Sequence, residues 1–92
     1  MLEISFDYRK SDRNEFERGL PFTLAEHLDW SLALIEEDIR KDYGERRYRA
    51  LVTIADRLHA LVFTPRGSAL HVISLRRANA REVKYYGHKT QS

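Results

Sequence analysis

Residues 69–86 of this chain read ALHVISLRRANAREVKYY and join a strand pattern to a helix pattern. Residues 69–76 have the apolar pattern of a strand, and Asn79 is a preferred N-cap for a helix that runs to about Tyr86. A cluster of guanidinium groups at a strand end suits the binding of phosphate. Five positive residues lie around this junction: Arg66, Arg76, Arg77, Arg81 and Lys84. The stretch has one carboxylate, that of Glu82.

Two further strands are predicted immediately upstream. Residues 48–55 and 58–64 are rich in apolar and β-branched side chains, and the polar pair Asp56-Arg57 between them indicates a hairpin. The turn residues of 65–68, PRGS, lead into the strand that begins at residue 69. An antiparallel set of three strands is therefore the best-defined part of the fold.

The N-terminal segment predicts a strand followed by a helix. Apolar and polar residues alternate over 2–6, as in a short half-buried strand. A helix over 12–18 would be capped by Ser11 or Asp12 and ended by Gly19.

A second helix and a fourth sheet strand are predicted before the turn at 42–45. Thr23 and Glu26 have the S/T-x-x-E spacing of a capping box, which predicts a helix over 24–31. Residues 33–40 fit either a strand with an acidic edge or a continuation of that helix, and we favour the strand.

These elements predict an α+β fold. Their order is strand, two helices, an antiparallel meander of three or four strands, and a C-terminal helix. An antiparallel sheet with its helices on one face is the simplest arrangement of them. We assign residues 1–87 to a single domain and 88–92 to a flexible tail.

Composition narrows the class of protein. The chain of 92 residues has 42% hydrophobic and 33% charged residues, which is typical of a folded domain. It contains no cysteine, which excludes disulfides, zinc–thiolate sites and cysteine nucleophiles. No apolar run approaches the length of a membrane span and no signal-peptide pattern is present, so we expect a soluble cytoplasmic protein.

Charge is distributed unevenly along the chain. Residues 1–45 carry six Lys and Arg against twelve Asp and Glu, whereas residues 46–92 carry ten against two. This division suggests two faces with different partners, the basic one suited to nucleic acid. Acidic and basic segments that pack side by side and neutralise each other would explain it equally well.

The main candidates for catalysis are His71, Arg76 and Arg77. His71 has a reference pKa near neutrality and could transfer a proton, while the arginines could stabilise a phosphate. A histidine in a strand is more often structural, and paired arginines at a strand end are more often solvated. Strand alternation places His71 and Arg76 on opposite faces unless a bulge intervenes, whereas His71 and Arg77 need no such device.

Other residues could bind substrate around these candidates. Tyrosines next to basic residues can stack bases of a single strand, although we expect at least one of Tyr85 and Tyr86 to anchor the last helix. No metal-ligand spacing links the four histidines, and the acidic run 36–38 is typical of a solvated edge. The predicted substrate-binding residues are Arg47, Arg66, Arg81, Lys84 and Tyr86.

With these residues identified, the chain resembles the BrnT toxin family, the toxin half of a bacterial type II toxin–antitoxin pair. Five segments in order carry the resemblance: Phe6-Asp7-Tyr8; Lys10, Asn14, Gly19 and Phe22 as K-x3-N-x4-G-x2-F; Tyr43-Gly44-Glu45 with Arg47-Tyr48; Val62-Phe63-Thr64; and 71–78, HVISLRRA, with Glu82 and Tyr86. Arg18 stands where the family usually has histidine, and His71 where it usually has a basic arginine.

The resemblance implies a RelE-like fold and a small endoribonuclease that needs no metal or other cofactor and inhibits translation. It also implies a BrnA-like antitoxin partner with a ribbon-helix-helix DNA-binding domain. Toxin and antitoxin could together form a heterotetramer. The expected chemistry is attack of a 2′-hydroxyl on its neighbouring phosphate. In this reaction His71 is the expected proton-transfer group, and Tyr85 or Tyr86 is a weaker candidate. Arg76 and Arg77 are expected to stabilise the charge on the phosphate, with support from Arg66 or Arg47. The alternatives are a non-catalytic basic module that binds nucleic acid or protein, and a relative that targets DNA gyrase.

Overall fold

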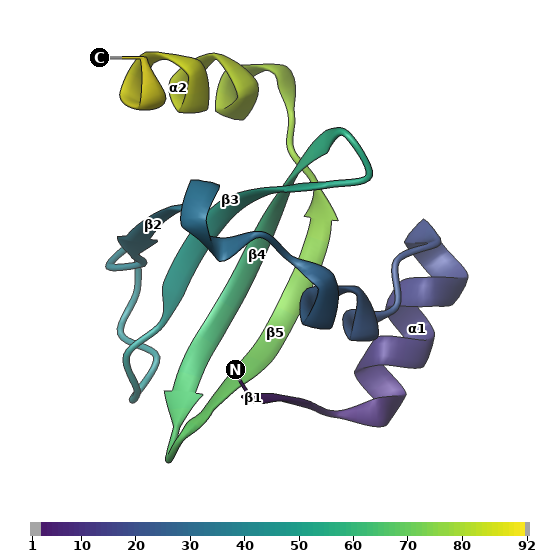
Figure 1. Ribbon diagram of the computed structural model, residues 1–92. Helices are drawn as coiled ribbons and strands as arrows, with labels where there is room; N and C mark the ends of the chain where they lie inside the picture. Colours follow the sequence, from purple (N-terminus) through teal and green to yellow (C-terminus); the bar gives the residue numbers. More distant parts are fainter. Residues whose placement is uncertain (1–2, 92) are drawn as a thin grey trace.

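A five-stranded sheet organises residues 3–91, the part of the chain that the computed structural model describes (Figure 1). The strand order across the sheet is β1-β5-β4-β3-β2. The elements along the chain are β1 (Glu3–Phe6), α1 (Tyr8–Arg18), the 3₁₀ helices η1 (Phe22–His27) and η2 (Trp30–Leu32), β2 (Leu34–Glu37), β3 (Tyr48–Ile54), β4 (Arg57–Arg66), β5 (Ala69–Arg77) and α2 (Ala80–Thr90).

The α+β class and the antiparallel meander are confirmed, because β2, β3, β4 and β5 pair in sequence as antiparallel neighbours. The strand favoured for residues 33–40 is β2. The expectation of a wholly antiparallel sheet is wrong, since β1 pairs with β5 in parallel. Parallel pairing needs a crossover connection, and the long path from β1 to β5 supplies it.

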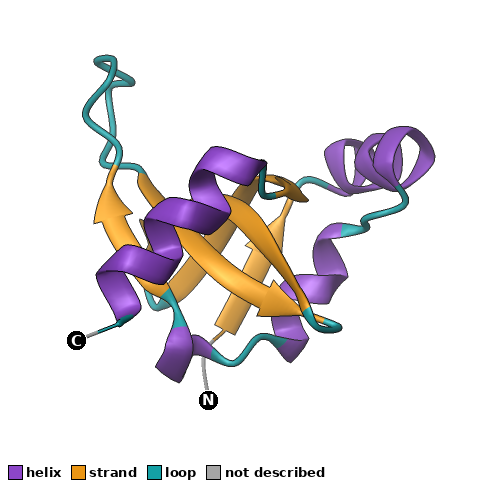
Figure 2. Ribbon diagram, turned by 90° about the horizontal axis from the view of Figure 1, so that it is seen from above, coloured by secondary structure: helices purple, strands orange, loops and turns teal. Residues whose placement is uncertain are grey.

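Helices cover both faces of the sheet, not one face as expected. The buried core lies between one face and η1, where Phe22 packs with Leu61, Val72 and Leu75. We call this side the core face. On the other face α2 crosses over one end of the strands, while the loop of residues 38–47 and α1 project from opposite sides of the sheet (Figure 2).

The N-terminal helix begins earlier than expected. Asp7, not Ser11 or Asp12, is the N-cap of α1, and its carboxylate accepts hydrogen bonds from the backbone of Arg9 and Lys10. Ser11 is buried instead, and its hydroxyl accepts a hydrogen bond from the backbone N–H of Phe22. The end of α1 at Gly19 is confirmed, in the left-handed conformation that favours glycine.

Asn14 joins α1 to the sheet. Its buried Nδ2 donates to the carbonyl oxygens of Leu20 at 2.7 Å and Leu75 at 2.9 Å. The register of β1 with β5 ends at Val72, so beyond it the β5 edge lacks a neighbouring strand and Asn14 satisfies the Leu75 carbonyl.

The second predicted helix is wrong in type. Residues 22–32 form two short 3₁₀ turns, and the Thr23–Glu26 capping box is absent because Pro21 occupies the N-cap position of η1. The buried side chains of Phe22 and Ala25 are three residues apart, the repeat of a 3₁₀ helix.

A β-bulge in β5 sets which side chains share a face. Val72 pairs with Phe63 and Ser74 pairs with Val62, so Ile73 is an extra residue in β5. Directly paired residues of antiparallel strands point to the same face. The bulge therefore brings His71 and Arg76 onto one face and turns Arg77 to the other, the reverse of what uninterrupted alternation predicts.

The C-terminal helix is held to the rest of the fold by three polar contacts. Its capping box between Asn79 and Glu82 confirms the predicted start, but α2 continues to Thr90, so residues 88–90 are helical and the end expected near Tyr86 is wrong. Arg76 donates two hydrogen bonds to the Glu82 carboxylate, at 2.8 and 2.9 Å. The hydroxyls of Tyr85 and Tyr86 donate to Glu36 Oε2 and the Leu32 carbonyl, both at 2.6 Å, so both rings anchor α2.

We expect the double change Ala55→Asn and Asp56→Gly to stabilise the protein by about 1 kcal/mol. Ala55 and Asp56 form the two-residue β3–β4 turn with φ of 48° and 66°, a left-handed conformation that Asn-Gly adopts with less strain. Thermal unfolding measures the effect. An unchanged or lower melting temperature would show that this turn stores no strain.

We expect Glu82→Gln to remove part of the acid sensitivity of folding. Hydrogen bonds from Arg76 lower the pKa of Glu82 to about 2 from its ordinary 4.5. A depressed folded-state pKa contributes stability above about pH 4.5 that is lost as the pH falls towards 2. Because the Arg76 side chain is 40% exposed, we expect only about 1–2 kcal/mol.

Urea unfolding at neutral pH and near pH 3 measures this effect. The wild type should lose part of that contribution at the lower pH, and the Glu82→Gln variant should show a correspondingly smaller loss. The exposed Glu17→Gln variant is the control. Identical pH dependence in the wild type and Glu82→Gln would contradict the role of this ion pair.

Candidate active site

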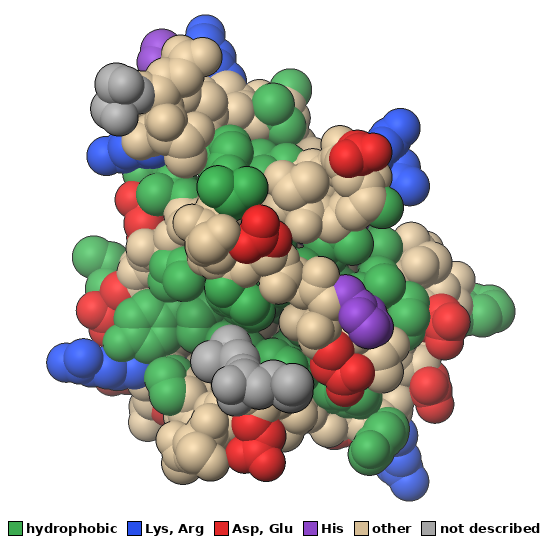
Figure 3. Space-filling view, in the orientation of Figure 1, with side chains coloured by type: hydrophobic (Ala, Val, Ile, Leu, Met, Phe, Trp, Pro, Cys, Tyr) green, Lys and Arg blue, Asp and Glu red, His purple; other side chains and the backbone are tan. Residues whose placement is uncertain are grey.

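The sheet face opposite the core face carries several positive and hydroxyl side chains, with Glu36 beside Arg49. Three cross-strand rows define it: Arg66 beside Ala69, Thr64 beside His71, and Arg49 beside Val62 and Ser74. One row further on, Ala60 lies beside Arg76. We call this surface the basic face. The opposite side of the molecule, seen in Figure 3, shows hydrophobic and acidic side chains at its centre and Lys and Arg at its margins.

His71 lies half-buried in the basic face. Ser5 of β1 is its neighbour in the parallel register, and Ser5 Oγ lies 2.9 Å from His71 Nδ1. This hydrogen bond orients the ring. Burial is the largest cause that lowers the pKa of His71 below 6.5, and the positive charge of Arg66 lowers it further. Both effects favour the neutral imidazole, the form a general base requires.

Glu45 links two arginines beside His71. Its carboxylate lies 3.4 Å from Arg47 Nε and 3.6 Å from Arg66 Nη2. The Arg47 guanidinium also stacks on the Tyr43 ring, 4.2 Å from its centroid. The carboxylates of Glu45 and Asp7 act on the His71 pKa in the opposite direction to Arg66 and Lys10. The histidine is thus surrounded by charged groups from three segments of the chain: the start of α1, the loop before β3 and the end of β4.

Arg76 shares the basic face with His71 but is distant from it. Four strand positions separate their pairing partners, Thr64 and Ala60, or about 13 Å at the rise of a β-strand. Arg76 is also engaged in the ion pair with Glu82. The structure therefore places His71 and Arg76 on one surface, but too far apart to contact the same phosphate.

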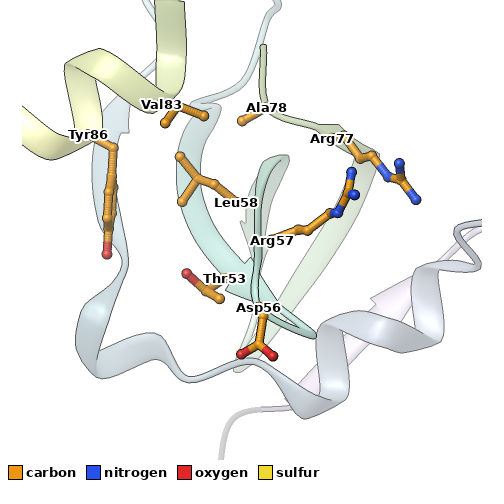
Figure 4. Close-up of a pocket in the computed structure, with 8 residues that line it drawn as sticks. All are labelled: Thr53, Asp56, Arg57, Leu58, Arg77, Ala78, Val83 and Tyr86. Carbon is orange, nitrogen blue, oxygen red and sulfur yellow. The ribbon is translucent and has the colours of Figure 1, made fainter. Parts of the chain in front are cut away.

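Arg77 does not join the other candidates. Because of the bulge it points to the opposite face, where its pairing partner is His59. It lines a cavity of about 480 Å³ at the end of the sheet, with Arg57 on the same wall and Val83 and Tyr86 of α2 across from it (Figure 4). The expectation that His71 and Arg77 share a face without a bulge in the strand is wrong, because the bulge separates them.

The predicted residues on α2 have different environments. Arg81 and Lys84 are exposed, and Arg81 lines a cavity of about 370 Å³ between α2 and the basic face. Tyr86 is half-buried, with its hydroxyl bound to the Leu32 carbonyl. Of the predicted substrate-binding residues, Arg66 lies near His71, and Glu45 joins Arg47 to Arg66.

Some residues around His71 were not predicted as site residues. Ser5 meets His71 only through the parallel β1–β5 pairing, which has no local sequence signal. Glu45 and Lys10 lie in the acidic N-terminal half of the chain, and the sequence marked them only as parts of motifs shared with the BrnT family. Arg49 could have been found, because it is the charged residue within the largely apolar sequence of β3.

No metal-binding cluster is present within residues 3–91, where three or more His, Cys, Asp or Glu side chains do not converge. The helices in the same part of the chain lack the length and hydrophobicity that crossing a membrane requires.

Comparison with protein families identifies the chain. The family model described as the ribonuclease toxin BrnT of type II toxin–antitoxin systems matches residues 6–82. Comparison with curated proteins and with solved structures found no match. The matched range contains the bulged strand, His71, its surrounding charges and the Arg76–Glu82 pair. Since the match spans most of its length, this chain belongs to the BrnT family of ribonuclease toxins.

Proposed function

We propose that this chain is an endoribonuclease with a RelE-like fold that cleaves RNA without a metal ion and so inhibits translation. The observation that supports this proposal best is the position of His71, oriented by Ser5 and set among cations on the open part of the basic face. Membership of a ribonuclease toxin family supports the choice of RNA as substrate.

In the proposed reaction, the 2′-hydroxyl of one nucleotide attacks the adjacent phosphorus. A bond forms between the 2′ oxygen and phosphorus, and the bond from phosphorus to the 5′ oxygen of the next nucleotide breaks. If Nδ1–H of His71 donates to Ser5 Oγ, Nε2 is the base that accepts the 2′-hydroxyl proton. The leaving 5′ oxygen takes its proton from solvent.

Arg66 and Arg47 stabilise the charge that develops on the phosphate. Both are held by Glu45, so they present fixed positive charge at little cost in reorganisation. These two guanidinium groups supply the charge that a metal ion provides in other nucleases. Arg76 contributes further along the face, and Arg77 has no part in the reaction.

A type II toxin–antitoxin family implies a cognate antitoxin partner. We propose that this partner is BrnA-like, with a ribbon-helix-helix domain, and that the two proteins form a heterotetramer in the cytoplasm. The acidic N-terminal half supports antitoxin contacts or oligomer packing. The mass of the co-expressed complex tests the stoichiometry.

Incubation of the purified chain with single-stranded RNA in EDTA tests the activity. We expect cleavage of the RNA and none of a 2′-deoxy oligonucleotide of the same sequence, because the attacking hydroxyl is absent there. RNA that is shifted on a native gel but remains intact would support the non-catalytic binding module instead.

A further inference from the structure

Four arginines from separate segments converge on the cavity between α2 and the basic face. We call this cavity of about 370 Å³ the α2 groove. Arg40 reaches it from the loop after β2, Arg49 from β3, Arg76 from β5 and Arg81 from α2. A groove lined by guanidinium groups on several elements suits a ligand with more than one anionic group.

Carboxylates orient these arginines without fully neutralising them. Asp38 binds Arg40 at 2.8 Å, Glu36 lies 3.9 Å from Arg49, and Glu82 binds Arg76. Within residues 3–91, Arg81 has no carboxylate within ion-pair distance. The groove thus gathers four positive charges against three negative ones.

The positive groups in the groove are close enough to repel one another. The charge of Arg40 lowers the pKa of the Arg76 guanidinium, although the hydrogen bonds to Glu82 outweigh this effect. Like charges brought together in the folded state cost free energy, which a bound anion would offset.

An aromatic ring and an apolar floor complete the groove. The Tyr85 ring lines it and is fixed by the hydrogen bond from its hydroxyl to Glu36. Leu51 is buried beneath. A fixed ring beside several guanidinium groups is the combination that binds the bases and phosphates of a single strand.

The α2 groove reaches the cross-strand row next to that of His71. Arg49 belongs to the cross-strand row that separates the His71 row from the Arg76 row. The distance of about 13 Å between the two outer rows is one that a short run of nucleotides spans. A strand with its scissile phosphate at His71 can therefore extend along β5 into the groove.

We propose that the α2 groove is the subsite for the nucleotides that flank the scissile phosphate of a single-stranded RNA. This inference rests on the proposed function. The groove makes the enzyme bind its substrate over several nucleotides, with Arg49 and Arg81 contacting phosphates and Tyr85 stacking a base.

Binding of a non-cleavable single-stranded oligonucleotide with 2′-O-methyl groups tests this subsite, because its readout does not require catalysis. The double variant Arg49→Gln and Arg81→Gln should bind about tenfold or more weakly than wild type in fluorescence anisotropy. Loss of two phosphate contacts should also reduce the slope of log affinity against log salt by about 1.4. The matched control is Arg57→Gln, an exposed arginine on the hairpin outside the groove.

Equal affinity of the double variant and the Arg57→Gln control would overturn the subsite. So would a double variant that keeps its RNA affinity but no longer binds the antitoxin, since the groove would then hold an acidic protein segment. The single Arg81→Gln change, on an exposed helix position, repeats the test if the double variant unfolds. RNA that binds through the groove but stays intact would contradict the proposed activity and leave the subsite standing.

Discussion

Replacing His71 with alanine is expected to lower the rate of RNA cleavage by about 10²–10⁴-fold, the usual contribution of a general acid or base. The substitution removes the group that accepts the 2′-hydroxyl proton and leaves Arg66 and Arg47 in place. Cleavage of a fluorescent oligoribonucleotide at saturating enzyme measures the effect. Because His71 is half-buried and bonded mainly to Ser5, the variant should still unfold cooperatively.

The pH dependence of cleavage separates this role from a structural one. The His71 pKa is below 6.5, and a base acts only when neutral, so the wild-type rate should fall as the pH drops through that lowered value. This acidic limb should be absent in His71→Ala. The matched control is His27→Ala at an exposed position on η1. A His71→Ala rate equal to that of the control would exclude His71 as the base.

Replacing Asn14 with aspartate is expected to destabilise the fold by about 3–5 kcal/mol. The change is nearly isosteric, but it substitutes a carboxylate oxygen for the Nδ2 that donates to Leu20 and Leu75. The Leu20 carbonyl then loses its donor, the Leu75 carbonyl keeps only the long hydrogen bond from Arg18 Nη1 at 3.5 Å, and both carbonyls face a buried negative charge. Such a loss is a large fraction of the stability of a small domain.

Urea unfolding with Asp12→Asn as the control measures this prediction. Asp12 lies on the exposed side of α1, so the reverse change there should alter stability by no more than about 0.5 kcal/mol. Protonation would return a donor to the introduced carboxyl group, so the variant should recover part of its loss at low pH. Equal stability of Asn14→Asp and wild type would contradict the role of Asn14.

The hairpins and the last helix could be predicted because their signals are local. The apolar and β-branched runs of β3, β4 and β5, the turns between them and the Asn79 cap each depend on neighbouring residues. The start of α1 depends on the local cap Asp7, which was not chosen because Ser11 and Asp12 are also preferred cap residues. The type of η1 was missed because buried contacts such as the hydrogen bond from Phe22 to Ser11 decide it.

The site could be predicted less well than the fold. His71, Arg47 and Arg66 were identified from residue type and position, but their arrangement depends on long-range pairing. A single extra residue, Ile73, reverses the facing of Arg76 and Arg77 relative to His71. The signal for a bulge is weak in the sequence, since both strand segments around it alternate normally.

Analysis of the ends that cleavage leaves on RNA tests the central claim most directly. A short single-stranded RNA is incubated with the purified chain in EDTA and the fragments are analysed by mass spectrometry. The proposed mechanism predicts fragments with a 2′,3′-cyclic phosphate and a 5′-hydroxyl, which disappear in His71→Ala. Intact RNA, or fragments with a 3′-hydroxyl and a 5′-phosphate, would contradict it.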